Sequence, residues 1–191
     1  LQELNQGMIS GFMKKTNIKA GIICVGNRDN RISATEEKFY RTAARVAMRT
    51  GCPVMTQGPQ MARKQIDLMT EEGFKPDRIV IGQCDRFPDI ERDKDIAKMG
   101  AYVAYDSAAY DESPEPGKRR IESIKAMVDA GLQKRVIISV DAIGYALGFP
   151  QPKRTYCYLL GGFLEELRQA GIDEKTIHTF LVENPRNVLA F

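Results

Sequence analysis

The stretch AGIICVGNRDNRISATEEKFYRTAARVAMRTGCPVMT, residues 20–56, contains the pattern that decides the fold. It begins with an apolar run of strand length, continues with apolar residues at helical spacing over 33–50, and ends with a second apolar run. Ser33 and Glu36 have the spacing of a capping box, and Gly51 stands where a helix would stop. A strand, a helix and a second strand in this order predict a parallel β-α-β unit.

The same alternation recurs along the rest of the chain. Most of the apolar runs are continuous, as in strands that are buried on both faces of a parallel sheet. They are AGIICVG (20–26), CPVMT (52–56), DRIVIGQ (77–83), AYVAYD (101–106) and RVIISVD (135–141). Helices are predicted at 1–14, 33–50, 59–72, 90–99, 118–130, 156–170 and 173–182, the last ending before Asn184-Pro185. The sequence therefore predicts a single α/β domain over residues 1–191, with about five parallel strands and flanking helices.

Composition excludes several classes of protein. The 28 Lys and Arg residues against 25 Asp and Glu residues leave a formal net charge of +3, too small to indicate a nucleic-acid or membrane-surface protein. No apolar run approaches the roughly 18 residues that cross a bilayer. The four cysteines form no CxxC pair, so we expect reduced thiols and a cytoplasmic protein. The turn VGNRDNR (25–31) lacks the glycine patterns of dinucleotide and P-loop sites.

Polar residues gather where the predicted strands end. In parallel α/β folds, ligands bind beyond the carboxyl ends of the strands. The residues found there are Cys24, Thr56, Gln57, Gln83, Cys84, Asp85, Arg86, Asp106, Ser139 and Asp141. The only histidine, His178, lies on the last predicted helix, where a surface or packing role is expected. One histidine cannot build a poly-histidine metal site from this chain's own residues.

Several segments taken together resemble the phosphotriesterase-related family of the metal-dependent amidohydrolases. They are AGIICVG, CPVMTQG, EEGFKPDRIVIGQCDR, GAYVAYD, RVIISVD and the closing LVENPRNVLAF, and they span nearly the whole chain in the family's order. The resemblance implies a partial (β/α)8 barrel of the TIM type, of which this chain supplies the equivalents of strands four to eight. It also implies hydrolysis of an ester, lactone, phosphotriester or amide bond in a small-molecule substrate.

The resemblance also implies a site, which this chain carries in altered form. The family holds two divalent metals, usually zinc, at the barrel mouth. The bridging lysine or glutamate is replaced by Cys24, and two histidine ligands are replaced by Gln57 and Gln83. Asp141 keeps the type of the aspartate that binds metal and takes a proton from the attacking water. Arg86 and Tyr145 are candidate substrate-binding residues.

Ligand chemistry indicates how serious these replacements are. Histidine nitrogen and thiolate sulfur are strong zinc ligands, whereas an amide oxygen is a weak neutral donor that suits hard cations. We therefore expect a degraded metal site, which binds either a divalent metal, zinc by resemblance, or no metal, and a chain with little or no activity of its own, a pseudoenzyme.

Alternatives remain open for the individual site residues. Asp141 is either a remnant ligand and base or a hydrogen-bonded carboxylate at a strand end. Cys24 is expected as a small buried core residue, because no histidine is available to activate its thiol. Gln57 and Gln83 either bind a ligand or fill a lost metal cavity. Arg86 is expected in a solvated or ion-paired position.

Two other functions remain open for the chain as a whole. The first is an active hydrolase with atypical ligands, completed by N-terminal strands outside this sequence. The second is a non-catalytic barrel module that self-associates. A complete barrel of this type has about 250 residues, and an open five-stranded sheet would expose its edges and inner face. We therefore expect a partner for the sheet, either a second copy or an N-terminal half, and no nucleic acid or membrane partner.

Overall fold

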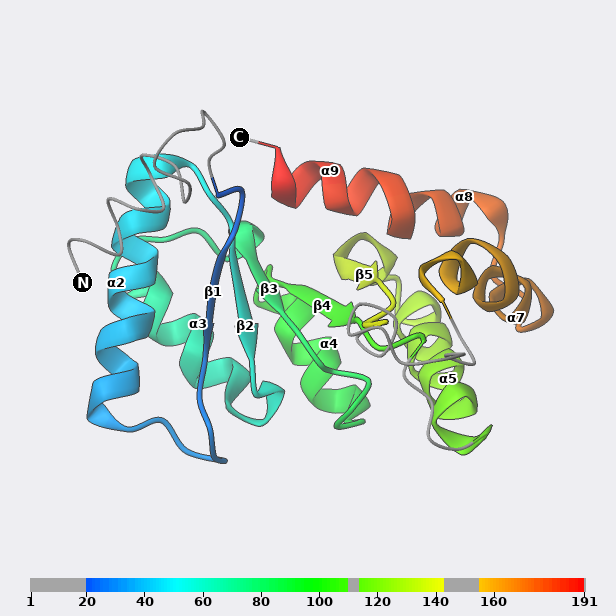
Figure 1. Cartoon of the computed structure of the whole chain (residues 1–191), viewed down its shortest axis with the longest axis horizontal. Coiled ribbons are helices and arrows are strands. Elements are labelled where there is room, and N and C mark those ends of the chain that lie inside the picture. Colours follow the sequence, from blue (N-terminus) through cyan, green and yellow to red (C-terminus); the bar gives the residue numbers. More distant parts are fainter. Residues whose placement is uncertain (1–19, 110–113, 143–154, 191) are drawn as a thin grey trace.

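The structure is a computed structural model that describes residues 20–109, 114–142 and 155–190 (Figure 1). Five strands form one parallel sheet in the order β1-β2-β3-β4-β5. They are β1 (Ile23–Gly26), β2 (Val54–Gln57), β3 (Ile79–Ile81), β4 (Tyr102–Tyr105) and β5 (Val136–Ile138). Each strand pairs with its neighbours along the chain, as in a barrel, whereas a doubly wound sheet reverses its strand order part-way. The predicted partial barrel of five parallel strands is confirmed.

The helices follow the strands as predicted, with shifted ends. Those between the strands are α2 (Ala34–Thr50), η1 (Pro59–Met61), α3 (Ala62–Thr70), η2 (Pro76–Arg78), α4 (Ile90–Lys98), α5 (Pro114–Asp129) and η3 (Gln133–Arg135). Those after β5 are η4 (Tyr156–Tyr158), η5 (Leu159–Phe163), α7 (Leu164–Gln169), α8 (Glu174–His178), η6 (Thr179–Glu183) and α9 (Asn184–Leu189). The helix predicted at 1–14 lies outside the described residues. None of the helices in the described ranges is long and apolar enough to span a membrane.

Local sequence signals determine both ends of α2. The Ser33 hydroxyl accepts a hydrogen bond from the Glu36 amide, and the Glu36 carboxylate accepts one from the Ser33 amide at 2.8 Å. Gly51 ends the helix with φ at 81°, a left-handed conformation that costs little without a Cβ. The predicted capping box and helix stop are confirmed.

The prediction that the last helix ends before Asn184-Pro185 is wrong. A π-helical turn, η6, leads directly into α9, which begins at Asn184. Pro185 is tolerated because it lies in the first turn, where its missing N–H has no intrahelical partner to lose. The Asn184 side chain is buried and donates hydrogen bonds to the carbonyls of Gln133 and Val136, at 2.8 and 2.7 Å.

Hydrophobic residues cover the two faces of the sheet unequally. The face packed against the helices belongs to the main core, which includes Ile23, Val54, Ile79, Val103 and Val136. The opposite, inner face has a second, smaller cluster of buried residues, made of Val80, Tyr102, Ala104 and Val188. Because successive side chains of a strand point to opposite faces, every second residue of each strand lies on the inner face of a barrel.

The amino end of the sheet is closed by the end of the chain. In Figure 1, α9 runs across the end of the sheet at which β1 begins. The Arg78 guanidinium, just before β3, donates hydrogen bonds to the carbonyls of Asn187 and Ala190 at 3.3 and 2.8 Å, and to the Gly51 carbonyl at 2.5 Å. These contacts attach α9 to the starts of β2 and β3.

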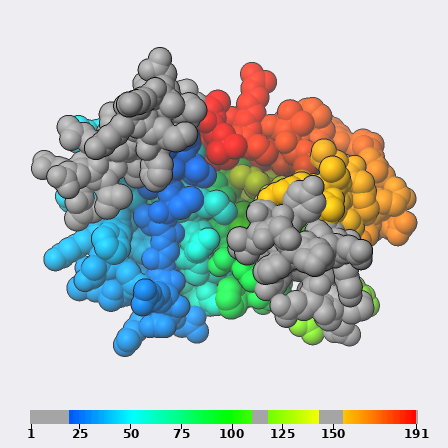
Figure 2. All heavy atoms as spheres, viewed as in Figure 1, coloured from blue at the N-terminus to red at the C-terminus, as the bar shows by residue number. Residues whose placement is uncertain are grey.

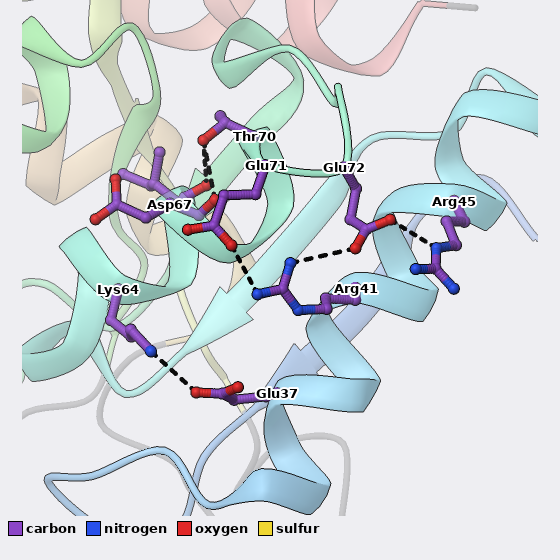
Figure 3. Close-up of polar contacts among 9 residues, drawn as sticks. Glu37, Arg41, Arg45, Lys64, Asp67, Thr70, Glu71 and Glu72 are labelled. Carbon is purple, nitrogen blue, oxygen red and sulfur yellow. Dashed lines mark hydrogen bonds and ion pairs between the residues drawn. The ribbon is translucent and has the colours of Figure 1, made fainter.

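Ion pairs connect α2 to the α3 region on the outside of the sheet (Figure 3). Arg41 lies 2.6 Å from the Glu71 carboxylate and 3.2 Å from that of Glu72, which also pairs with Arg45 at 2.7 Å. These side chains are at least partly exposed, so the pairs help to orient α2 relative to the α3 region more than they stabilise the fold.

Candidate functional site

The carboxyl ends of the strands lie along one edge of the sheet, opposite α9. In the pairing of β1 with β2, Cys24 lies opposite Met55 and Gly26 opposite Gln57. Cys24 and Gln57 are exposed, whereas Ile23, Val54 and Thr56, the alternate residues, are buried. Cys24 and Gln57 therefore both lie on the inner face of the sheet. Gln57 is the last residue of β2, and we call this carboxyl edge of the sheet the rim.

Cys24 is not the buried core residue that the sequence predicts. Its side chain is exposed because it faces the inner side of an open sheet, whereas core positions of β1 face α2. Partial burial of the thiol still raises the pKa of Cys24. The thiol is therefore less readily ionised than a free one, and it has no described histidine beside it.

A buried polar network holds the end of β2 in place. Gln65, on the buried face of α3, donates hydrogen bonds to the carbonyls of Gln57 and Gly58, at 3.0 and 2.8 Å, and to the Asn27 side chain at 2.7 Å. The Thr56 hydroxyl donates to Gln65 at 2.7 Å, and Tyr40 donates to Asn27 at 2.9 Å. Sequence reasoning missed this network, although a glutamine among the apolar positions of α3 was a signal for it.

The end of β3 is held by a carboxylate from β4. Asp106 accepts a hydrogen bond from the Gln83 amide at 2.9 Å and one from the Ser107 hydroxyl at 3.3 Å. Gly82 permits this approach, because a Cβ there would lie 2.8 Å from the Thr56 carbonyl oxygen and 3.0 Å from Asp106. Gln83 and Asp141 both have left-handed backbones, with φ at 61° and 45°. Such conformations are uncommon for residues other than glycine and are enriched at functional sites.

Asp85, in the loop after β3, holds the end of β4. Its carboxylate accepts hydrogen bonds from the amides of Asp106 and Ser107, at 3.3 and 2.9 Å, and from Arg120 of α5 at 2.5 Å. Burial, followed by the charge of Asp85, raises the pKa of Asp106 to about 6. Asp106 can therefore carry a proton at mildly acidic pH, which an ordinary aspartate does not.

Asp141, which follows β5, is paired with a cation from the loop that follows β3. The Arg86 guanidinium lies 3.8 Å from the Asp141 carboxylate, and both side chains are about one-third exposed. The ion pair agrees with the expectation that Arg86 is ion-paired, and the candidate role of Arg86 in substrate binding stays a prediction. The candidate Tyr145 lies outside the described residues, so its role also stays a prediction.

His178 lies far along the chain from these strand ends, at the end of α8. Its side chain is exposed, and its imidazole is 3.8 Å from the Glu183 carboxylate. This placement agrees with the predicted surface role.

The sequence matches the model of the Phosphotriesterase family over residues 1–189. The chain belongs to the phosphotriesterase family. It is 31% identical to the Phosphotriesterase homology protein of Escherichia coli, over 97% of this chain and 65% of that protein. It is 35% identical to the Phospho-furanose lactonase of Mycoplasmopsis synoviae, over 94% of this chain and 53% of that protein.

Solved structures of the phosphotriesterase family share the fold. The E. coli phosphotriesterase homology protein, crystallised with phosphate in its active site, superposes with a TM-score of 0.85 at 31% identity, over 96% of this chain and 64% of that chain. The lactonase of Listeria monocytogenes gives a TM-score of 0.85 at 27% identity, over 99% and 60%. The chain thus spans less than two-thirds of the length of these relatives.

Proposed function

We propose that this chain derives from phosphotriesterase-family hydrolases that cleave an ester, lactone, phosphotriester or amide bond, and that its own rim does not support the metal-dependent reaction. Family membership and the relatives described as lactonases support the first part. The observation that carries the second part is the presence of Gln57 and Gln83 at the rim, where the resemblance implies histidine ligands.

The donor groups at the rim do not fit a pair of zinc ions. Two amide side chains replace two imidazoles, and the Cys24 thiol replaces a bridging carboxylate. Within the described ranges, no three His, Cys, Asp or Glu residues are grouped so that they could hold a metal ion. The one retained ligand type, Asp141, cannot hold two cations by itself.

A guanidinium also stands close to the retained aspartate. Arg86 supplies a positive charge 3.8 Å from Asp141, on the carboxylate that the resemblance assigns to the metal. A divalent cation bound to Asp141 would be repelled by this charge unless Arg86 moved away. The ion pair therefore supports the same conclusion as the amides.

This loss matters because the metal supplies the nucleophile in such hydrolases. A bound metal lowers the pKa of water to about 7, far below its value in bulk solution, so that hydroxide forms at neutral pH. Among the described residues, the side chains at these strand ends supply no comparable Lewis acid. We therefore expect no hydrolysis by this chain above the uncatalysed rate.

Restoring the implied ligands tests the proposal. Zinc binding is measured by calorimetry and by metal analysis on the wild type and on the triple variant Cys24→Lys, Gln57→His and Gln83→His. We expect no stoichiometric zinc in the wild type, and a zinc affinity that rises about tenfold or more in the variant, as changes in ligand shells produce.

The matched control places the same residue types at exposed positions of the C-terminal helices. It is the triple variant Cys157→Lys, Gln169→His and Asn187→His, at positions that are exposed in the structure. Equal zinc affinity in both triple variants would show that the assigned positions are wrong. Stoichiometric zinc in the wild type, lost on Asp141→Ala, would instead support an active hydrolase with atypical ligands.

A further inference from the structure

Exposed cations gather at the amino end of the sheet, opposite the rim. They lie in the segments that lead into the strands, or on the helix that crosses this end. They are Arg49 before β2, Lys75 before β3, Lys98 before β4, Lys134 before β5 and Arg186 on α9. None of these five side chains forms an ion pair with a described residue. We call the five residues the basic face.

Contacts between the segments hold them together as one surface. The hydrogen bonds of Arg78 attach α9 to the starts of β2 and β3, and those of Asn184 attach it to η3. The segment before β4 adjoins η2, because a Cβ at Gly100 would lie 3.4 Å from the Cβ of Pro76. In Figure 2, the red atoms of α9 are uncovered at the upper edge of the molecule.

The net charge of the chain does not reveal this surface. The value of +3 sums over all residues, whereas cations on the outer helices are paired with carboxylates. Arg41 with Glu71 and Arg168 with Glu174 are examples, both at 2.6 Å. The expectation that the chain has no membrane partner rests on the net charge alone, which records nothing of how the charges are distributed.

Helix dipoles account for only part of the basic face. Arg49, Lys98 and Arg186 lie in the last turns of their helices, where the carbonyl ends of a helix attract cations. Lys75 and Lys134 lie at η2 and η3, which are turns of three residues without a comparable dipole. An external anionic partner would explain all five.

Two aliphatic side chains accompany the cations on η6 and α9. Val182 is 47% and Leu189 is 46% exposed. They lie four residues before and three residues after Arg186, a spacing that places all three on one side of a helical segment. Among the described residues, this surface has no exposed aromatic ring on which the bases of a single-stranded nucleic acid could stack. Cations mixed with exposed aliphatic side chains are typical of proteins that bind at the surface of anionic membranes.

We propose that the basic face binds the surface of an anionic lipid bilayer. The cations contact the lipid phosphates and carboxylates, and Val182 and Leu189 reach the boundary between headgroups and acyl chains. The rim lies at the opposite edge of the sheet, so a chain bound in this way keeps its rim toward the solvent. The proposal does not depend on whether the rim binds metal.

Cosedimentation with lipid vesicles tests the proposal. One set of vesicles contains equal parts of phosphatidylserine and phosphatidylcholine, and the reference set contains phosphatidylcholine alone. We expect the chain to bind the anionic vesicles only. We also expect the binding to weaken as the salt concentration rises from about 0.01 M to about 0.15 M, because the screening length shortens.

Reversing charges on the basic face should remove the binding. The variant carries three substitutions, Lys75→Glu, Lys98→Glu and Lys134→Glu. We expect the affinity for anionic vesicles to fall about a hundredfold or more, since each cation near such a surface contributes about fivefold. If this variant does not fold by circular dichroism, glutamine replaces glutamate at the same three positions and in the control.

The matched control reverses three exposed cations elsewhere and has the same net charge. They follow β1, lie in the first half of α2 and lie near the start of α5: Arg28→Glu, Lys38→Glu and Lys118→Glu. We expect little change in affinity at about 0.15 M salt, because charges more than about 8 Å from the bilayer are screened.

A second pair of variants tests the aliphatic contact. Leu189→Ser should weaken the binding about tenfold or more, because the side chain no longer enters the acyl boundary. Phe39→Ser removes a side chain of α2 that is 45% exposed, and it should leave the affinity unchanged.

Three outcomes would overturn the proposal. The first is no binding to the anionic vesicles at low salt. The second is an equal loss in the two triple variants, because the binding would then report net charge and not the basic face. The third is binding of single-stranded polyuridylic acid without binding of vesicles, which would identify a nucleic acid as the partner. No arm measures hydrolysis or zinc, so these outcomes are independent of the proposed function.

Discussion

Asp106 lies at the end of β4, beneath the rim and near two other carboxylates. Burial raises its pKa to about 6, with smaller contributions in the same direction from the charges of Asp85 and Asp141. Hydrogen bonds from the Gln83 amide and the Ser107 hydroxyl act in the opposite direction, because they stabilise the carboxylate. The folded protein therefore binds a proton at Asp106 more tightly than the unfolded chain does.

The sign of the pH dependence follows from this difference. A raised pKa stabilises the fold below the unfolded value of 3.8, and this contribution is lost as the pH rises through about 6. We expect Asp106→Asn to raise the free energy of unfolding at pH 7 by about 2 kcal/mol, allowing for solvent screening of a partly exposed group. An asparagine can still accept from Gln83 and donate to Ser107. Urea denaturation of both proteins at pH 4, 5, 6 and 7 measures the effect, and a gain that does not grow with pH would contradict it.

The residues at the rim differ in how well their position and exposure could be predicted from the sequence. Asp141, Gln57 and Gln83 were identifiable because each follows an apolar run of strand length. The prediction failed for Cys24, since the exposure of an inner-face residue depends on what lies across the barrel. The contacts of Gln65 with Asn27 and of Asp106 with Gln83 join residues 38 and 23 positions apart, and local patterns do not encode such pairings.

At the scale of elements, a buried ion pair joins α5 to the sheet. The Arg120 and Asp85 side chains are 2% and 0% exposed, and their atoms are 2.5 Å apart. Asp85 also accepts the amide hydrogens at the end of β4. The pair therefore positions α5 against two strand ends, including the one that carries Asp106.

Removing the arginine should be costly because it leaves the carboxylate buried without its cation. We expect Arg120→Met to lower the free energy of unfolding by about 3–5 kcal/mol, as for other broken buried pairs. Lys118→Met, an exposed position on the same helix, should change it by less than about 0.5 kcal/mol. Chemical denaturation of the two variants gives the comparison. Equal small effects would show that the pair does not hold α5 in place.

At the scale of the whole molecule, α9 closes the amino end of the sheet. Val188 is fully buried against the inner face, whereas Val182 in η6 is 47% exposed. We expect Val188→Ala to cost about 2–3 kcal/mol through lost apolar burial and a residual cavity. Val182→Ala should cost less than about 0.5 kcal/mol. Thermal and urea denaturation test both, and equal costs would contradict the packing of α9 described above.

The sequence alone determined the elements and their class. The alternation of apolar runs with segments of helical periodicity indicated five parallel strands. The capping box of Ser33 and Glu36 and the glycine at position 51 determined the ends of α2, because such signals act over a few residues. The tertiary structure decided which faces are covered. In the folded chain, Arg86 pairs with Asp141, and Cys24 is exposed. The helical segment continues past Asn184 as α9 and reaches the amino end of the sheet. Those outcomes depend on contacts between residues far apart in the chain, whose free energies no local pattern records.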